Sequence, residues 1–206
     1  MKQKKVFGIG FHRTGTTSLQ TALEALDYNV TGMRDEDWAD YVAGDYDSIK
    51  RTIATFDGFR DMPWPLMYKW LHETYPDAVF VLTYRGSESW ARSCAGNYKT
   101  RPYAMFPEIY GFDSFAGNEE TAIAVYEKHI ADVRAYFADH PAQFLEVDVT
   151  SGLSWDVLCD FLGEPLPDRP FPHANKRPKS IFKKVYWRLL RTLAPAYYRR
   201  VVRDKV

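Results

Sequence analysis

A glycine-bearing loop with a cation inside it is the first stretch of the chain that could do chemistry. In FGIGFHRTGTTSLQTAL, residues 7–23, Gly10 and Gly15 have the spacing of a Walker A phosphate-binding loop. Thr16 stands where that loop has its lysine, and Arg13 lies within the loop instead. Hydroxyl side chains follow at four positions, Thr14, Thr16, Thr17 and Ser18. Backbone N–H groups at the start of a helix bind anions, and a guanidinium suits phosphate oxygens, so the stretch predicts a phosphate site.

The same stretch lacks what a metal-dependent triphosphatase needs. No lysine follows Gly15, and the predicted strands 78–84 and 143–149 do not end in a clear acidic Walker B position. Asp148 is the nearest candidate for that acid and a weak one. The loop therefore suits a phosphate that is bound without a metal. The alternative is a glycine turn capped by threonine, with Arg13 on the surface.

A second pairing of a cation with a hydroxyl follows another predicted strand. In YRGSESWARS, residues 84–93, Arg85 leaves the strand end and Ser93 lies two turns into the next helix. Both side chains could therefore reach one phosphate. Together, HRTGTTSL and YRGSESWARS resemble the two nucleotide-binding elements of sulfotransferases that use 3′-phosphoadenosine-5′-phosphosulfate (PAPS). The resemblance continues through WDVLCDFLGEPLPDRPFPHANK to the C-terminal part of a bacterial and fungal branch, and it spans roughly residues 6–176.

The resemblance implies roles for particular residues. The first loop would hold the 5′-phosphosulfate, Arg85 and Ser93 would hold the 3′-phosphate, and a loosely matching basic loop would close over the nucleotide. The cofactor-binding residues are then His12, Arg13, Thr14, Gly15, Thr16, Thr17, Ser18, Arg85, Ser93, Asn175 and Lys176. The family transfers a sulfuryl group in line to a hydroxyl or amine, releases 3′,5′-phosphoadenosine (PAP) and needs no metal.

Two residues are the predicted catalytic pair, Arg13 for the leaving phosphate and Asp61 for the acceptor proton. Asp61, in GFRDMPWP, occupies about the place where many family members have a histidine or glutamate. An aspartate in water is a weak base for an alcohol, so burial beside Trp64 would have to strengthen it. His12 and His129 are the rival bases, and a turn or helix-capping carboxylate is the other interpretation of Asp61.

Strands alternating with helices position these residues. Short apolar runs at 6–11, 78–84 and 143–149 predict strands, and the stretches 64–75, 87–98, 123–137 and 154–163 predict helices. This order favours one α/β domain over residues 1–176, a P-loop-type three-layer fold with a parallel sheet covered on both faces. Ligands in such sheets bind outside the carboxyl ends of the strands, where both motifs begin.

Two segments are predicted to build the acceptor pocket. They are Met33 to Phe56 and Thr100 to Asn118, and the second is expected to be a long surface loop. Their aromatic residues suggest an apolar, sugar or lipid acceptor. The acceptor expected from the sequence is therefore a small molecule, a sugar or a lipid head group.

Charged residues are distributed unevenly along the 206-residue chain. The segment from Lys176 to the end holds eleven Lys and Arg and one acid, Asp204, for a net charge of +10, and the rest balances it at −10. Residues 177–206 predict a basic amphipathic tail, which would either lie on an anionic membrane or pack on the acidic body. An acidic body would repel nucleic acid. The two cysteines, Cys94 and Cys159, and the lack of a long apolar run favour a cytoplasmic protein with peripheral membrane contact left open.

The function expected from these features is a PAPS-dependent sulfotransferase. One rival is a P-loop kinase or NTPase, which the missing lysine and the weak Walker B acid disfavour. The other rival is a non-catalytic, membrane-peripheral nucleotide-binding protein, which the basic tail motivates.

Overall fold

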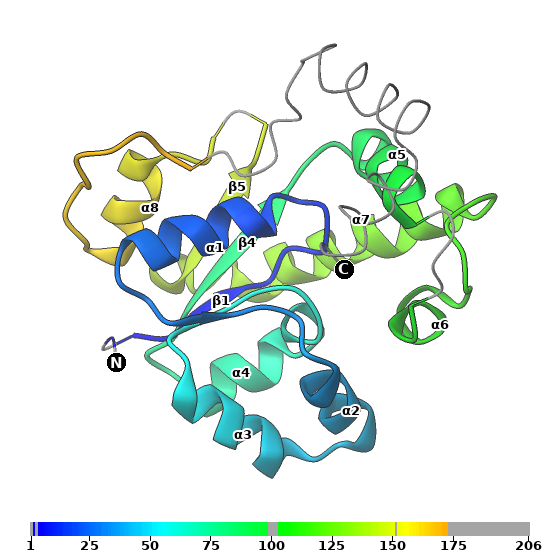
Figure 1. The fold of residues 1–206 in the computed structure, drawn as a ribbon, viewed down its shortest axis with the longest axis horizontal. Helices are drawn as coiled ribbons and strands as arrows, with labels where there is room; N and C mark the ends of the chain where they lie inside the picture. The colour runs from blue at the N-terminus through cyan, green and yellow to red at the C-terminus, as the bar shows by residue number, and fades with distance from the viewer. Residues whose placement is uncertain (1, 3, 99–102, 151, 173–206) are drawn as a thin grey trace, which may run out of the picture. The chain divides into compact units, whose positions relative to one another are not determined.

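The computed structural model describes residues 2, 4–98, 103–150 and 152–172 of the chain. Its elements, drawn in Figure 1, are β1 (Val6–Gly8), α1 (Thr16–Ala25), β2 (Val30–Thr31), α2 (Asp35–Ala43), α3 (Tyr46–Thr55), β3 (Gly58–Phe59), the 3-10 helix η1 (Trp64–Leu66), α4 (Tyr68–Thr74), β4 (Val79–Tyr84), α5 (Ser87–Tyr98), α6 (Met105–Tyr110), α7 (Glu119–Phe137), the 3-10 helix η2 (Pro141–Gln143), β5 (Phe144–Asp148) and α8 (Trp155–Leu162).

A five-stranded sheet in the order β2-β3-β1-β4-β5 forms the centre of the fold. Every pairing between neighbouring strands is parallel; Phe7 of β1, for example, lies opposite Phe59 of β3 and Phe80 of β4. Parallel neighbours need crossover connections, and helices supply them here. The predicted α/β class and the P-loop-type three-layer arrangement are confirmed.

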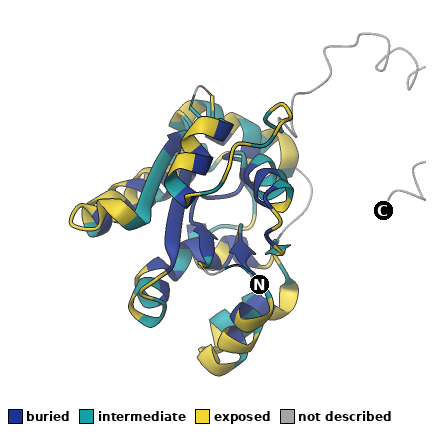
Figure 2. Cartoon of the chain, turned by 90° about the vertical axis from the view of Figure 1, so that its left-hand side faces the viewer, coloured by how far each residue is buried: buried dark blue, intermediate teal, exposed yellow. Residues whose placement is uncertain are grey.

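Two apolar cores lie on the opposite faces of this sheet. Because side chains alternate along a strand, Phe80 and Leu82 of β4 enter one core while Val79 and Val81 enter the other. The first core includes side chains from α3, α4, α5, α6 and α7, and the second includes side chains from α1 and α8. Figure 2 shows the result, with buried central strands and helices that are exposed on their outer sides.

Most predicted elements are present, but the stretch predicted as one helix over 64–75 consists of η1 followed by α4. The strand at 78–84 corresponds to β4, and the helices at 87–98, 123–137 and 154–163 correspond to α5, α7 and α8. The sequence analysis missed β2 and β3, because two-residue strands are too short to show a pattern.

The expectation of a long surface loop at Thr100–Asn118 was wrong for the residues that the structure describes. This segment contains α6, and it buries Met105, Phe106, Tyr110 and Phe115. The aromatic residues that suggested a binding loop pack on one another: the Phe106 and Phe115 ring centroids are 5.0 Å apart. Packing therefore overrode the turn signals of proline and glycine.

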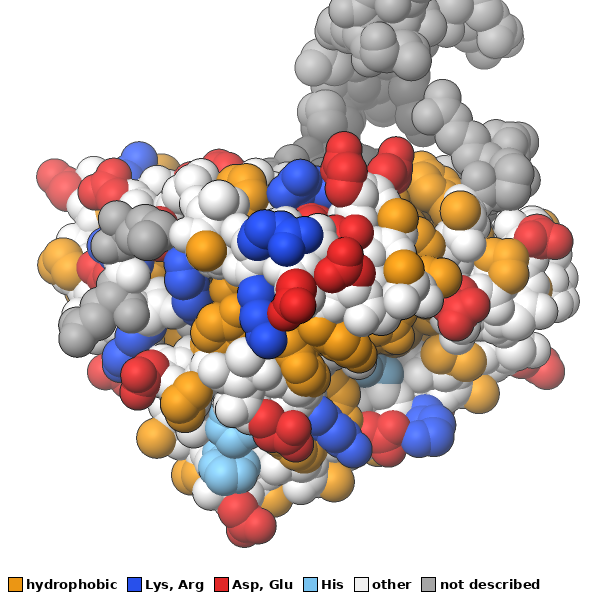
Figure 3. All heavy atoms as spheres, turned by 90° about the horizontal axis from the view of Figure 1, so that it is seen from below, with side chains coloured by type: hydrophobic (Ala, Val, Ile, Leu, Met, Phe, Trp, Pro, Cys, Tyr) orange, Lys and Arg blue, Asp and Glu red, His pale blue; other side chains and the backbone are white. Residues whose placement is uncertain are grey.

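Charges of both signs are mixed on the surface of the described residues. On the face shown in Figure 3, Lys and Arg side chains lie beside Asp and Glu, with apolar side chains between them. Within the described part of the chain, no helix is both long and apolar enough to cross a membrane. The predicted basic tail, 177–206, lies outside the described residues.

Candidate active site

The glycine-bearing loop joins β1 to α1 at the carboxyl end of the central strand. Arg13 and Gly15 have left-handed backbones, with φ of 66° and 88°. A Cβ on Gly10 would lie 2.2 Å from the Thr83 carbonyl oxygen of β4, so only glycine fits there. A compact loop with alternating backbone handedness turns its N–H groups toward one side, which is how such loops bind anions.

Hydroxyl side chains of the loop divide into an internal and an outer group. Thr14 is fully buried, and its Oγ1 donates to the Phe11 carbonyl at 2.5 Å and lies 3.0 Å from Thr83 Oγ1. This hydroxyl therefore holds the loop against β4 and is already hydrogen-bonded. Thr14 could contact a ligand only through its backbone. Thr16 is also buried, whereas Thr17 and Ser18 are half-buried on the first turn of α1.

The two predicted phosphate elements meet in space. Arg13 Nε donates to Ser93 Oγ at 3.1 Å, across 80 residues of sequence. Arg85 lies at the end of β4, and its Nε donates to Ser89 Oγ one turn before Ser93. The structure thus brings Arg13, Arg85 and Ser93 to one edge of the sheet. Their roles in nucleotide binding stay predictions.

Residues that the sequence analysis did not select hold this arrangement. The Tyr126 hydroxyl of α7 accepts from Arg85 N and donates to Arg85 O, both at 3.0 Å. Tyr126 stacks on Trp90 at 4.2 Å between ring centroids, and Trp90 Nε1 donates to the His12 carbonyl at 2.9 Å. Tyr126 and Trp90 occupy core positions on their helices, so no local signal distinguishes them from ordinary packing residues.

The start of α1 offers hydrogen bonds that an anion could accept. The start of α1 has no capping hydrogen bond from a side chain, because its N-cap residue is Gly15. Ser18 N donates to the Gly15 carbonyl at 2.9 Å, so the N–H groups that precede it in the loop and at the helix start are the ones that suit an oxyanion. Asn175 and Lys176, the remaining predicted cofactor contacts, lie outside the described residues. Among the described residues, no group of three or more His, Cys, Asp or Glu could hold a metal ion.

Asp61 lies after β3, the strand beside β1, and so reaches the same edge of the sheet. Its backbone is left-handed, with φ of 61°, a conformation that is uncommon outside glycine but that aspartate adopts more readily than most residues. Asp61 Oδ2 pairs with the guanidinium of Arg60, which also donates from Nε to Gln20 Oε1 of α1 at 2.5 Å. Asp61 Oδ1 is buried and has no hydrogen-bond partner among the described residues.

The two histidines considered as rival bases are buried. Burial, with a smaller effect of Arg13, lowers the pKa of His12 to about 3, and its Nε2 lies 3.1 Å from the Tyr110 hydroxyl. Burial also lowers the pKa of His129 to about 4, and its Nε2 lies 2.8 Å from the Ile9 carbonyl oxygen. Both imidazoles are neutral at pH 7, and each ring already contacts a protein oxygen. The role of Asp61 as the base stays a prediction.

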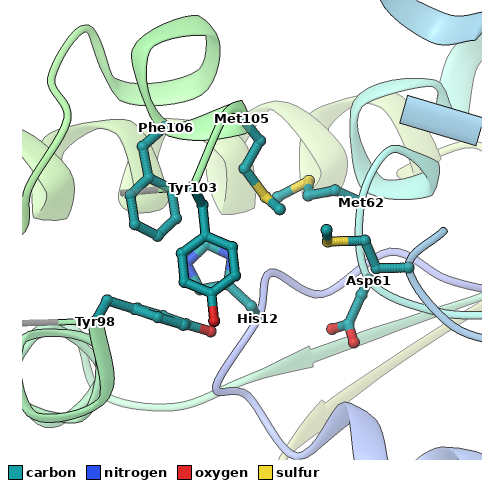
Figure 4. Close-up of a pocket in the computed structure, with 8 residues that line it drawn as sticks. His12, Asp61, Met62, Tyr98, Tyr103, Met105 and Phe106 are labelled. Carbon is teal, nitrogen blue, oxygen red and sulfur yellow. The ribbon is translucent and has the colours of Figure 1, made fainter. Parts of the chain in front are cut away.

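A pocket of about 90 Å³ lies beside Asp61 and is shown in Figure 4. Eight residues line it: His12, Met33, Asp61, Met62, Tyr98, Tyr103, Met105 and Phe106. Met33 comes from one predicted acceptor segment, and Tyr103, Met105 and Phe106 come from the other. Met62 and Tyr98 were missed, since a methionine beside a proline and a tyrosine near a helix end carry no sequence signal for a pocket.

Comparison with known proteins gives two matches. The family model described as a sulfotransferase domain matches residues 5–105 and 97–180. The chain is also similar to the Ava biosynthesis cluster protein M of Aspergillus versicolor. The two are 23% identical over an alignment of 233 residues, which covers 92% of this chain and 88% of the relative. The family match extends over most of the chain and includes both phosphate elements, so this protein belongs to the sulfotransferase domain family.

Proposed function

We propose that this protein transfers a sulfuryl group from PAPS to a hydroxyl-bearing acceptor. The hydrogen bond from Arg13 to Ser93 carries the proposal, because it joins the element assigned to the 5′-phosphosulfate to the one assigned to the 3′-phosphate. Only a nucleotide that carries phosphate at both positions would need both elements.

Each residue has a part in this proposal. Loop N–H groups and Arg13 bind the 5′ end, and they stabilise the negative charge that grows on the leaving phosphate. Arg85 and Ser93 bind the 3′-phosphate, and Asp61 accepts the proton of the acceptor. When bound, PAPS supplies the activated sulfuryl group.

The fungal relative supports a biosynthetic setting for the acceptor. Its name places that relative in a biosynthesis cluster. A small biosynthetic molecule is therefore the acceptor we propose here, in preference to a polysaccharide.

Calorimetry with PAP and ADP tests the donor assignment. Arg85 should recognise the 3′-phosphate, which ADP lacks, so the wild-type protein is expected to bind PAP at least tenfold more tightly than ADP. Arg85→Ala should lose a charge-assisted contact worth about 1.5–3 kcal/mol, and with it most of the preference. Equal affinities of the wild-type protein for the two nucleotides would contradict the proposal.

Arg92→Ala is the matched control for this measurement. Arg92 lies on the same helix, α5, but it is exposed and pairs with Glu88. Its loss should leave the preference for PAP intact. If both variants lost the preference equally, general surface charge rather than Arg85 would be responsible.

A further inference from the structure

The pocket beside Asp61 has a mixed lining, in which apolar side chains lie beside His12, Asp61 and the hydroxyls of Tyr98 and Tyr103. Three methionines and the ring of Phe106 contribute no strong hydrogen-bonding group, and Figure 4 shows the Met62 and Met105 side chains extending toward each other. Methionine side chains adapt to irregular apolar shapes. Those hydroxyls of a sugar that faced the methionines would be buried without partners, which is costly.

One buried acceptor atom in the lining lacks a partner among the described residues. Asp61 Oδ1 is buried and receives no hydrogen bond from any described residue, whereas Oδ2 is held by Arg60. Buried polar atoms in native proteins are nearly always paired, so an unpaired carboxylate oxygen at a pocket wall indicates a missing donor. An O–H or N–H group of a bound molecule would supply it.

The charges around the pocket favour a neutral donor over a cation. The ion pair with Arg60 already compensates the carboxylate of Asp61. His12 is neutral because burial lowers its pKa to about 3, and the positive Arg13 follows it in the loop. An ammonium group would therefore give up its hydration without meeting an uncompensated negative charge.

From these observations we infer that the acceptor is a neutral, apolar molecule that presents a hydroxyl group to Asp61 Oδ1. This inference rests on the proposed function and deepens it. The acceptor oxygen bonds to sulfur as the bond from sulfur to the phosphate oxygen breaks; the phosphate leaves with the electron pair, and the hydroxyl proton passes to Asp61 Oδ1. A volume of about 90 Å³ is several times the ~10–15 Å³ that one water needs on the same measure, so the pocket admits the reacting end of the acceptor.

Three small probes test the inference in the full-length protein with PAPS as donor. Benzyl alcohol and benzylamine have the same shape, but the first is neutral and the second is an ammonium ion at pH 7. Glucose presents hydroxyls on a polar skeleton. The expected kcat/KM for benzyl alcohol is at least tenfold above that for either other probe. A preference for benzylamine or glucose would overturn the inference.

A charge variant tests why the alcohol is preferred. Arg60→Gln removes the partner of Asp61 and leaves a buried carboxylate that can attract a cation. The ratio of kcat/KM for benzyl alcohol to that for benzylamine is expected to fall by roughly tenfold. An unchanged ratio would show that the ion pair does not set this selectivity.

A pair of variants at one position tests the apolar lining. Met105→Gln keeps the length of the side chain but adds an amide, whereas Met105→Leu keeps an apolar wall. Met105 is 5% exposed, so the KM for benzyl alcohol should rise roughly tenfold more in the Gln variant than in the Leu variant. Equal changes in the two variants would contradict an apolar acceptor site.

Binding measurements separate failure of this inference from failure of the proposed function. Calorimetry reports PAP binding without any acceptor, and NMR saturation transfer reports benzyl alcohol bound to the PAP complex. If PAP binds but benzyl alcohol neither binds nor reacts, the acceptor inference is wrong and the donor assignment stands. If PAP does not bind, the proposed function is wrong, and the acceptor inference falls with it.

Discussion

The proposed donor side and the proposed acceptor side of this site lie at one edge of the sheet but are built differently. The donor side consists of loop 9–15, Arg85 after β4 and Ser93 within α5, and it relies on backbone N–H groups and two arginines. The acceptor side is a pocket whose apolar side chains come from separate segments around residues 33, 62, 98 and 103–106. One side depends on local conformation, and the other depends on tertiary packing.

This difference predicts which mutations affect which step. An anion site that is built from backbone N–H groups keeps its affinity when outward side chains change, but it loses affinity when the loop is displaced. A pocket that is lined by side chains can lose its function through the substitution of a single lining residue. Nucleotide affinity and turnover should therefore respond to different substitutions.

The largest expected effect is on turnover, at Asp61. Asp61→Asn keeps the shape of the side chain and removes the proton acceptor, so kcat with benzyl alcohol should fall by about 10²–10⁴. PAP affinity, measured by calorimetry, should change by less than threefold, because the donor elements are untouched. If the variant kept nearly full turnover, Asp61 would not be the base. If it lost PAP binding instead, the two sides would not be separable.

The complementary substitution is in the loop, at Gly10. In Gly10→Ala the new Cβ would lie 2.2 Å from the Thr83 carbonyl oxygen, so the loop must move away from β4. Overpacking of this kind costs about 1–3 kcal/mol, and urea denaturation should show that loss together with weaker PAP binding. Gly96→Ala is the control, because a Cβ at this position in α5 meets nothing within 4 Å. A Gly10→Ala protein with native stability and PAP affinity would contradict the steric account.

The same division explains what could be predicted from sequence. Gly10, Arg13, Arg85 and Ser93 form two contiguous patterns beside recognisable strands, and the structure brings them together. Asp61 could be selected only by its place relative to the family pattern. The pocket could not be outlined from sequence, because a residue such as Met62 acquires its role only when a distant segment packs beside it.

The donor loop is also linked to pH through two buried histidines. His12 and His129 have pKa values of about 3 and about 4 in the folded state because burial disfavours the charged imidazole. The unfolded chain takes up protons near pH 6.5, where the native state does not, so stability is lost as the pH falls below that value. Each histidine should lower the free energy of unfolding by roughly 2 kcal/mol between pH 7.5 and pH 5.

Urea denaturation at the two pH values measures this loss. The glutamine in His129→Gln can still donate to the Ile9 carbonyl. The loss of unfolding free energy between pH 7.5 and pH 5 should be smaller in this variant by roughly 2 kcal/mol, the contribution of one histidine. His140→Gln, at an exposed position, is the control and should keep the wild-type difference. A loss that was equal in all three proteins would show that His129 does not contribute to it.

The smallest expected effect is on PAP affinity, at Tyr126, which would act by positioning Arg85. Tyr126 bonds both backbone groups of Arg85 through its hydroxyl, so Tyr126→Phe removes two hydrogen bonds while keeping the ring stacked on Trp90. The 3′-phosphate contact should weaken by about 0.5–1.5 kcal/mol, seen in calorimetry as a two- to tenfold loss of PAP affinity. ADP affinity should not change, because ADP has no 3′-phosphate for Arg85 to bind. Tyr136→Phe, which removes a hydroxyl 3.1 Å from His72 Nδ1, should leave the ratio of PAP to ADP affinity unchanged. An equal loss for PAP and ADP in Tyr126→Phe would mean that Tyr126 supports the fold and does not position Arg85.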